Sequence, residues 1–167
     1  MSVSFKIRVL LLILTAGFAL TALTINYTNK NEEILALDAQ KLEIKIRGKE
    51  ELIGNLLNSP AFRDSLKNVH NNDDWAQYII SEFSEKRNIS FQTFENGKLK
   101  FWTGHRIALE TDTLLKEGST FLQRENGYYE AIRRVWGNFS VVCFIPVKSQ
   151  YPYQNEFLKN RISPDLL

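Results

Sequence analysis

An uninterrupted apolar run near the N-terminus limits most strongly what this chain can fold into. Residues 9–25 read VLLLILTAGFALTALTI and contain no charged side chain. As a helix with a rise of ~1.5 Å per residue, the run would be ~26 Å long, close to the hydrocarbon thickness of a bilayer. We therefore expect a transmembrane helix over residues 9–27, in contact with the lipid bilayer.

The charges on either side of this run predict its orientation. Lys6 and Arg8 precede it, whereas residues 26–33 carry one Lys and two Glu. Because basic flanks stay on the cytoplasmic side, residues 1–8 should be cytoplasmic and the rest exported. This predicts a single-pass membrane protein with its domain outside the cytoplasm. A cleaved signal peptide has the same basic start and apolar centre, but residues 21–24 match a small-residue cleavage site poorly, which favours the uncleaved anchor.

The next segment has the spacing of a helix. Its apolar residues recur at steps of three, four or seven, at Leu35, Leu42, Ile46, Ile53, Leu56 and Leu57. Pro60 follows the break at residues 58–59 and is well suited to open another helix. We expect a stalk helix over residues 28–58. It could cover one side of the following domain or form a dimeric coiled coil. Too few regular heptads are present to establish the coiled coil.

Residues 59–167 change from helical to strand periodicity. Short helices are expected over residues 60–69 and around Trp75 to Phe83, with Asp73 or Asp74 as a cap. Strands are expected at 89–94, 98–103, 119–124, 128–135 and 139–147, a short extended piece at 106–109, and a closing helix at 153–161. The most apolar strand, 139–147, should be central. Helices followed by antiparallel strands predict an α+β domain with short helices packed on a roughly five-stranded sheet.

Composition and motifs exclude several classes of function. There are 21 Lys and Arg against 19 Asp and Glu, so a net charge of +2 gives no electrostatic case for a nucleic-acid partner. The single cysteine, Cys143, lies in an apolar run and is expected to be buried. His70 and His105 lack metal-ligand spacing, and no nucleophile elbow or phosphate loop is present. We expect no catalytic residues, no metal and no cofactor.

Five side chains around the predicted sheet are candidates for binding a ligand: Trp102, Arg106, Tyr128, Tyr129 and Arg133. Trp102 is expected in the core or in a pocket wall. Since strand residues alternate between faces, Arg133 and Arg134 should point to opposite sides, and only one can serve a pocket. That Arg could hold a carboxylate through two hydrogen bonds. The simpler alternative is a surface Arg stacked on a Tyr.

Four segments of the second half carry a resemblance to a known family: FENGKLKFW (94–102), ENGYY (125–129), FIPVK (144–148) and YPYQNEFL (151–158). Together they resemble the extracytoplasmic input region at the N-terminus of sensor histidine kinases from Bacteroidetes-type bacteria, over roughly residues 90–165. The layout is also similar to the PAS-like or Cache-like extracellular sensor fold, in which a membrane-proximal helix leads into a five-stranded sheet.

The resemblance implies the ligand-sensing input module of a two-component receptor, single-pass within this sequence, in a bacterial inner membrane with its domain in the periplasm. An unknown small-molecule or protein signal would shift the stalk helix, in a homodimer, and so control a kinase. These 167 residues contain no second apolar span, phosphoacceptor segment or ATP-binding domain, so the kinase part would lie outside this sequence. The alternative is a membrane-anchored structural or assembly protein that docks a partner through its sheet edge. An exported enzyme ranks third, because no acid–base or nucleophile set can be assembled.

Overall fold

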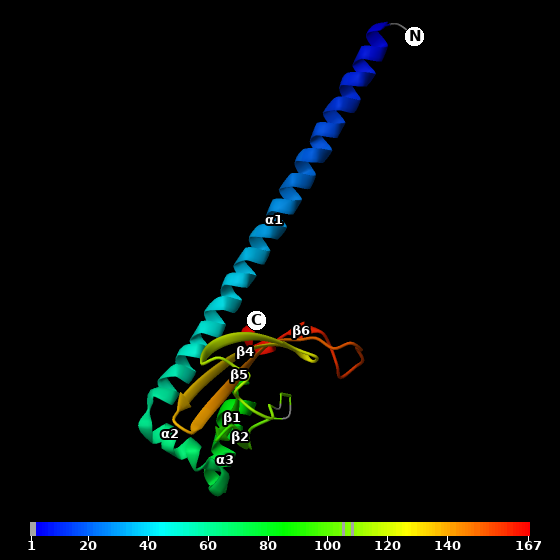
Figure 1. Ribbon diagram of the computed structural model, residues 1–167. Coiled ribbons are helices and arrows are strands. Elements are labelled where there is room, and N and C mark those ends of the chain that lie inside the picture. Colours follow the sequence, from blue (N-terminus) through cyan, green and yellow to red (C-terminus); the bar gives the residue numbers. More distant parts are fainter. Residues whose placement is uncertain (1–2, 105, 108) are drawn as a thin grey trace. The chain divides into compact units, whose positions relative to one another are not determined.

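One long helix, α1 (Val3–Asn58), runs through both compact units of the chain, Met1–Lys41 and Leu42–Leu167 (Figure 1). The computed structural model describes residues 3–104, 106–107 and 109–167, and only the backbone at 3–4 and 26–33. The predicted membrane segment and stalk are therefore parts of the same helix. Gly48 and Gly54 lie inside it without ending it. The expected N-terminal apolar helix is confirmed.

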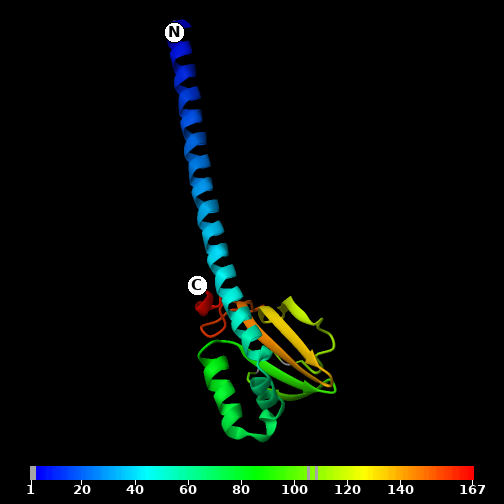
Figure 2. The ribbon, with the colours of Figure 1, turned by 90° about the vertical axis from the view of Figure 1, so that its left-hand side faces the viewer.

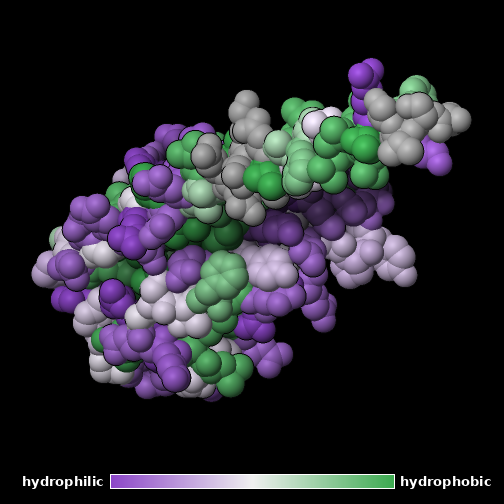
Figure 3. All heavy atoms as spheres, turned by 90° about the horizontal axis from the view of Figure 1, so that it is seen from above, coloured by the Kyte–Doolittle hydropathy of each residue, from purple (hydrophilic) through white to green (hydrophobic). Residues whose placement is uncertain are grey.

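The first unit consists of α1 alone. Its segment Phe5–Ile25 is long and apolar enough to cross a membrane, and none of it is buried against other residues. Leu12 is 70% exposed and Leu10 67% exposed. Figure 3 shows hydrophobic side chains along this helix, while the surface of the second unit is largely hydrophilic. Such apolar surface is unfavourable in water, so it needs lipid or a protein partner unless it is removed as a signal sequence.

The second unit adds short helices and a sheet to residues 42–58 of α1. The helical elements are α2 (Pro60–Lys67), η1 (Val69–Asn71), α3 (Asp73–Ile79) and the π-helical η2 (Ile80–Glu85). The strands are β1 (Ser90–Glu95), β2 (Lys98–Trp102), β3 (Gly118–Arg124), β4 (Gly127–Trp136), β5 (Phe139–Ser149) and the short β6 (Arg161–Ile162), followed by η3 (Pro164–Leu166).

The sheet is antiparallel, with strand order β2-β1-β5-β4-β3, and β6 pairs with the end of β5. β5 is central as predicted, and its residues 139–147 are all buried. The predicted turn at Asn96 and Gly97 joins β1 to β2, and both residues have a positive φ, of 51° and 73°. That conformation matches the right-handed twist of the flanking strands. The α+β class with an antiparallel sheet is confirmed.

One side of the sheet, which we call the helical face, packs against α1, α2 and α3 (Figures 1 and 2). Ile53 and Leu57 of α1 are 0% and 1% exposed there. They pack into one cluster with sheet residues that include Phe91, Val141 and Cys143. This half of α1 is therefore part of the core rather than a free stalk.

The opposite side, which we call the loop face, is covered by the connection 103–117 between β2 and β3. Its apolar cluster contains Phe94, Tyr129, Ala131, Val142 and Phe144 from the sheet, with Ile107, Leu109 and Leu115 from the connection. The buried Gln92 side chain donates to the Ile107 carbonyl and accepts a hydrogen bond from the Leu109 amide at 3.3 Å. Side-chain hydrogen bonds thus hold a segment without regular structure against the sheet. In its described residues 106, 107 and 109, the extended piece predicted here is not part of a strand.

The closing helix predicted over residues 153–161 is wrong. Residues 150–160 form a loop, and β6 begins at Arg161. The Asn155 side chain accepts hydrogen bonds from the amides of Phe157 and Leu158 at 2.8 and 2.7 Å. Because an Asn side chain that bonds the backbone ahead of it stabilises a turn, the segment turns instead of continuing as a helix.

The cap of α3 also differs from the prediction. Asn72, not Asp73 or Asp74, occupies the N-cap position, and its side chain accepts a hydrogen bond from the Trp75 amide at 3.0 Å. Asn and Asp are equally good at this position, so type alone could not decide between neighbours. Asp73 and Asp74 lie in the first turn, where negative charge favours the helix dipole.

Candidate functional site

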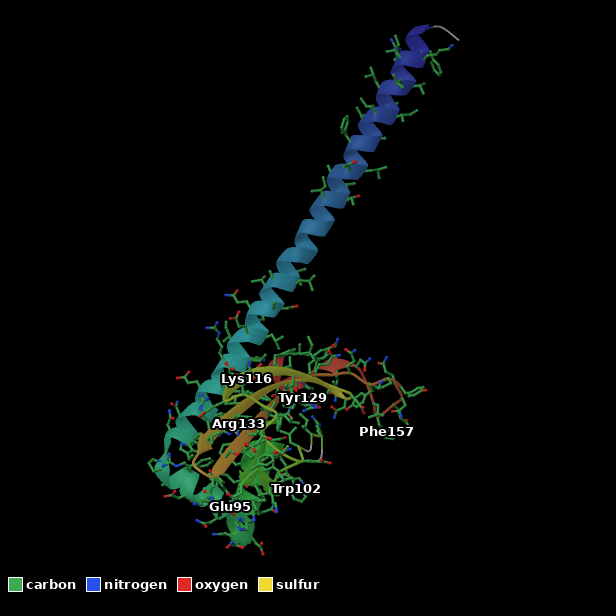
Figure 4. The ribbon with its side chains drawn as sticks, in the orientation of Figure 1. Glu95, Trp102, Lys116, Tyr129, Arg133 and Phe157 are labelled. Carbon is green, nitrogen blue, oxygen red and sulfur yellow. The ribbon has the colours of Figure 1, made fainter. Side chains whose placement is uncertain are left out.

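Trp102 does not line the core. Its side chain is 54% exposed at the end of β2, an edge strand, whereas Phe101 is only 9% exposed. Alternation along the strand gives the buried place on the helical face to Phe101. Figure 4 shows Trp102 away from Tyr129 and Arg133. The expected core position of Trp102 is therefore wrong, and Trp102 is not among the residues that line the hollows described below.

Arg133 is occupied by a carboxylate of the chain itself. Its Nε donates to Asp112 Oδ2 at 2.8 Å, and a terminal nitrogen lies 2.7 Å from the same oxygen. The Ser140 hydroxyl donates to that oxygen at 2.5 Å. Asp112 is 1% exposed, so this is a buried polar network on the loop face. The geometry that would bind a ligand carboxylate binds Asp112 instead.

The neighbouring residues of β4 alternate as expected. Arg133 pairs with Val142 of the loop-face cluster, whereas Arg134 pairs with Val141 of the helical face. The same alternation separates Tyr128 from Tyr129. Tyr129 is 4% exposed within the loop-face cluster.

Tyr128 takes part in a surface stack. Its ring lies 6.0 Å from that of Phe121 in a stacked geometry, and Lys148 Nζ lies 5.8 Å from its centre. A cation over a tyrosine face is a stabilising surface contact. The sequence offered a surface Arg stacked on a Tyr as the simpler alternative to a binding site. Tyr128 has this kind of contact, with Lys148 as the basic side chain.

Arg106, the remaining candidate, lines a hollow of about 350 Å³ together with Ile107, Arg124, Glu125 and Asn126. Small-molecule sites begin at roughly 300 Å³, so the size is sufficient for a compact ligand. A second hollow of about 200 Å³ shares Arg124 and Glu125 as walls and continues to Tyr128 and Tyr151. Sequence reasoning missed Arg124 and Asn126, because both lie at the β3–β4 turn, where turn chemistry explains them.

Tyr129 lies close to this hollow. Burial raises the pKa of its hydroxyl and so does the nearby Tyr151, while the positive charge of Arg106 and a hydrogen bond with Asn126 act in the opposite direction. The Tyr129 hydroxyl therefore stays protonated near neutral pH and can donate a hydrogen bond. Of the five predicted residues, Arg106 and Tyr129 are brought together, and Trp102 and Arg133 are not part of this group.

Two hydrogen bonds and one glycine fix the walls of the hollow. Asn126 Nδ2 donates to the Arg106 carbonyl at 2.6 Å, and the Gln150 amide donates to the Asn126 carbonyl at 3.1 Å. Gly127 has a φ of 149°, and a Cβ there would lie 2.1 Å from the Lys148 carbonyl oxygen. Only glycine allows β4 to approach β5 this closely. The turn, the connection and the start of the C-terminal loop are thereby held together.

A serine joins α1 to the sheet between two carboxylates. The Ser119 hydroxyl lies 2.7 Å from Glu50 Oε1 of α1 and also contacts Glu130 Oε1 of β4. A hydroxyl donates one hydrogen, so both contacts exist together only when one carboxyl is protonated. Burial raises the pKa of Glu130, and the charge of Glu50 raises it further, although the Ser119 hydrogen bond lowers it. This contact binds a proton more readily than an exposed Glu.

The C-terminal residues form a second link to α1, which we call the C-terminal clamp: Lys49, Asn88, Ser163 and Asp165. Lys49 forms an ion pair with Asp165, and Asn88 donates to Asp165 Oδ1 at 2.9 Å and to the Ser163 hydroxyl at 2.8 Å. Burial alone would raise the pKa of Asp165, but the hydrogen bonds from Lys49, Asn88 and Ser163 outweigh it and lower the pKa. Leu166, next in the chain, is 1% exposed.

Other chemistry-bearing groups do not assemble into a site. Cys143 is fully buried, and burial raises its thiol pKa strongly, which makes the reactive thiolate unfavourable. No three His, Cys, Asp or Glu side chains among the described residues are placed to hold a metal ion. His70 Nε2 lies 3.1 Å from the side-chain nitrogen Nδ2 of Asn71. His105 lies outside the described residues.

Comparison with known proteins finds no matching family model, curated protein or solved structure. Function is therefore inferred from the residues and their geometry.

Proposed function

We propose that this chain is the extracytoplasmic, ligand-sensing input module of a membrane-bound sensor histidine kinase. One observation carries the proposal: α1 contains both the apolar segment Phe5–Ile25 and the core residues Ile53 and Leu57 of the second unit. A change in how the sheet packs on these residues therefore acts on the same helix that would enter the membrane. The kinase itself would be encoded beyond residue 167.

The layout of the second unit supports a PAS-like domain. Its five long strands form one antiparallel sheet in which the first and fifth strands pair at the centre, and the helix from the N-terminal segment covers one face. This arrangement is similar to the PAS-like layout, in which a membrane-proximal helix leads into a five-stranded sheet. The loop face and its hollow lie on the side of the sheet opposite α1.

The last residues of this sequence lie against α1 within the second unit. Lys45 Nζ of α1 donates to the Leu167 carbonyl, and the C-terminal clamp holds the preceding residues. A following membrane span would therefore start beside α1, where a relative movement of the two helices could carry a signal. Exposed apolar residues in the first unit, Leu35 at 68% and Leu37 at 56%, offer a surface for a second copy of the helix.

Signalling in this proposal is a population shift. A ligand that binds one packing of the loop face more tightly than another changes the balance between them, by no more than its difference in affinity. The contacts of α1 with the sheet, through Ser119, and with the chain end, through Asp165, are the interactions that would differ between the two states.

The coding sequence downstream of codon 167 is the direct test. We expect a second apolar span, a helix carrying a phosphoacceptor His and an ATP-binding domain. A reading frame that ends without a second span and a kinase would overturn the proposal. The outcome of this test does not depend on the structure of residues 1–167.

Topology is tested separately, because the proposal places the N-terminus in the cytoplasm and the domain in the periplasm. Alkaline phosphatase fused after Leu167 should be active and membrane-bound in cells, and inactive when residues 5–25 are deleted. The mass of the mature protein distinguishes the alternative. A chain that begins near residue 25 and is released from membranes would be a cleaved, exported protein.

The second candidate, an anchored assembly protein, is favoured by the free edge of the sheet. β3 is an edge strand, and Phe121 on it is 59% exposed. Edge strands can pair with an added strand from a partner. A photo-crosslinking residue at position 121 tests this: the receptor predicts at most crosslinks between copies of the chain, and the assembly protein predicts a crosslink to a different protein that Thr120→Pro abolishes.

A further inference from the structure

Two arginines at the hollow on the loop face have no partner in the part of the chain that is described. Arg106 and Arg124 both line it, and neither is within ion-pair distance of any carboxylate that the structure describes. By contrast, Arg47, Arg87 and Arg133 each pair with an acidic side chain. Two guanidinium groups on one hollow repel each other unless an anion lies between them.

The backbone that carries these arginines is fixed, although their side chains are exposed. The connection is held at the Arg106 carbonyl by Asn126 and at the next residue by Gln92. Arg124 ends β3 in register with Gly127 of β4. In this packing of the loop face, a ligand would therefore need to order only two side chains, which keeps the entropic cost of binding low.

The polar groups around the hollow suit an anion that also accepts hydrogen bonds. Arg106, Arg124 and Glu125 give its lining a net positive charge. A guanidinium presents paired N–H donors that match the two oxygens of a carboxylate or phosphate. Asn126 belongs to the lining, and the protonated Tyr129 hydroxyl is nearby.

We propose that this hollow binds a small organic anion through a carboxylate or phosphate group held by Arg106 and Arg124. Only the role of this anion as a signal rests on the proposed receptor function. Binding itself is a property of residues 1–167, so a failed titration leaves the receptor proposal standing, and a failed topology or coding-sequence test leaves the binding site standing.

The test is a titration of the full chain in neutral detergent micelles, at constant low ionic strength so that screening does not change between samples. The probes are acetate, succinate and citrate in one arm and inorganic phosphate in the other, with glycerol as an uncharged control. The readouts are isothermal calorimetry and the melting temperature, which a ligand raises by mass action. We expect at least one anion to bind and glycerol not to bind. The arm that responds identifies the anionic group.

The variants Arg106→Gln and Arg124→Gln should each weaken binding at least about tenfold, because each removes a charge-assisted pair of hydrogen bonds. Arg161→Gln is the matched control, since Arg161 is also exposed but lies on β6, outside the residues that line the hollow. It should leave affinity unchanged, and all three variants should melt like the wild type without ligand. No binding by any anion, or equal loss in Arg161→Gln, would overturn the proposal.

Discussion

The two faces of the sheet are built from the same strands but are held in different ways. Along β5, Val141 and Cys143 point to the helical face, and Val142 and Phe144 point to the loop face. The helical face is covered by three helices, and it buries mainly apolar side chains, with Thr93 as a buried polar residue. The loop face is covered by a connection without regular structure, and it buries the polar side chains Gln92, Asp112 and Ser140.

This difference separates stability from response. Apolar burial on the helical face contributes roughly 1.5–3 kcal/mol for each large side chain and does not depend on direction. The polar contacts of the loop face depend on distance and angle, so they specify one arrangement of the connection and are lost together when it moves. The loop face, which also carries the hollow, is therefore where a ligand can most readily change the structure.

The largest effect should come from breaking the buried ion pair of the loop face. Arg133→Leu leaves Asp112 buried without its cation, and removing one partner of such a pair costs about 3–5 kcal/mol of the free energy of unfolding. Arg134→Leu is the matched control on the same strand and opposite face, with an expected loss below about 1 kcal/mol. Urea unfolding of the full chain in detergent measures both. Similar losses would show that the pair does not stabilise the loop face.

The double variant Arg133→Leu/Asp112→Asn separates the ion pair from simple packing. It removes the buried charge, so it should be more stable than Arg133→Leu alone. A double variant that is less stable than the single one would show that Asp112 acts mainly through Ser140.

On the helical face, truncating a core residue of α1 should cost slightly less. Ile53 is 0% exposed, and Ile53→Ala should lower the free energy of unfolding by about 2–4 kcal/mol through lost apolar contact and a cavity. Ile44→Ala, at a position of the same helix that is 61% exposed, should change it by less than about 0.5 kcal/mol. Thermal unfolding monitored by circular dichroism measures both. Equal losses would mean that α1 does not belong to the core.

The C-terminal clamp should contribute about 1 kcal/mol and lose it in acid. The folded-state pKa of Asp165 is lowered, so its contribution is complete above the ordinary pKa of an Asp, about 4, and disappears as pH falls through the lower folded value. Asp165→Asn should therefore be less stable than the wild type at pH 7 and equal to it near pH 2. Melting temperatures across this range provide the measurement. A constant difference would rule out the ionised carboxylate as the cause.

The smallest expected effect comes from the proton held where Ser119 contacts Glu50 of α1 and Glu130 of the sheet. The folded-state pKa of Glu130 is raised, so its stabilising contribution is complete below the ordinary pKa of a Glu, about 4.3, and is lost as pH rises through the folded value. Glu130→Gln should keep the contact at all pH values and exceed the wild type by a few tenths of a kcal/mol at pH 8. Glu110→Gln, an exposed position in the connection, is the control. A wild type that gains stability from pH 4 to 8 relative to Glu130→Gln would contradict this.

Much of the fold follows from local patterns. Four patterns each predict one local structure, and the structure contains all four. They are the apolar run, the helical spacing up to Leu57, the turn at Asn96 and Gly97, and the apolar strand 139–147. The closing helix failed because Asn155 forms a turn within the loop, an alternative that helical spacing does not reveal.

The candidate site depended on tertiary structure for most of its residues. Strand alternation made Arg133 a reasonable candidate for binding a ligand carboxylate. Its donors instead bind the buried Asp112, which lies 21 positions earlier in the chain. Arg106 and Arg124 lie on different elements and meet only because Asn126 holds the turn to the connection. Residue type and spacing contain no information about such pairings.

The sequence by itself determined the apolar helix, the α+β class and the order of the five long strands, because hydrophobic periodicity and turn residues act over a few neighbouring positions. Only the tertiary structure decided which arginine is paired and which is free, and that α1 forms part of the domain core. Those outcomes depend on contacts between residues far apart in the chain, where burial and hydrogen-bond geometry select one partner among several of the same chemical type.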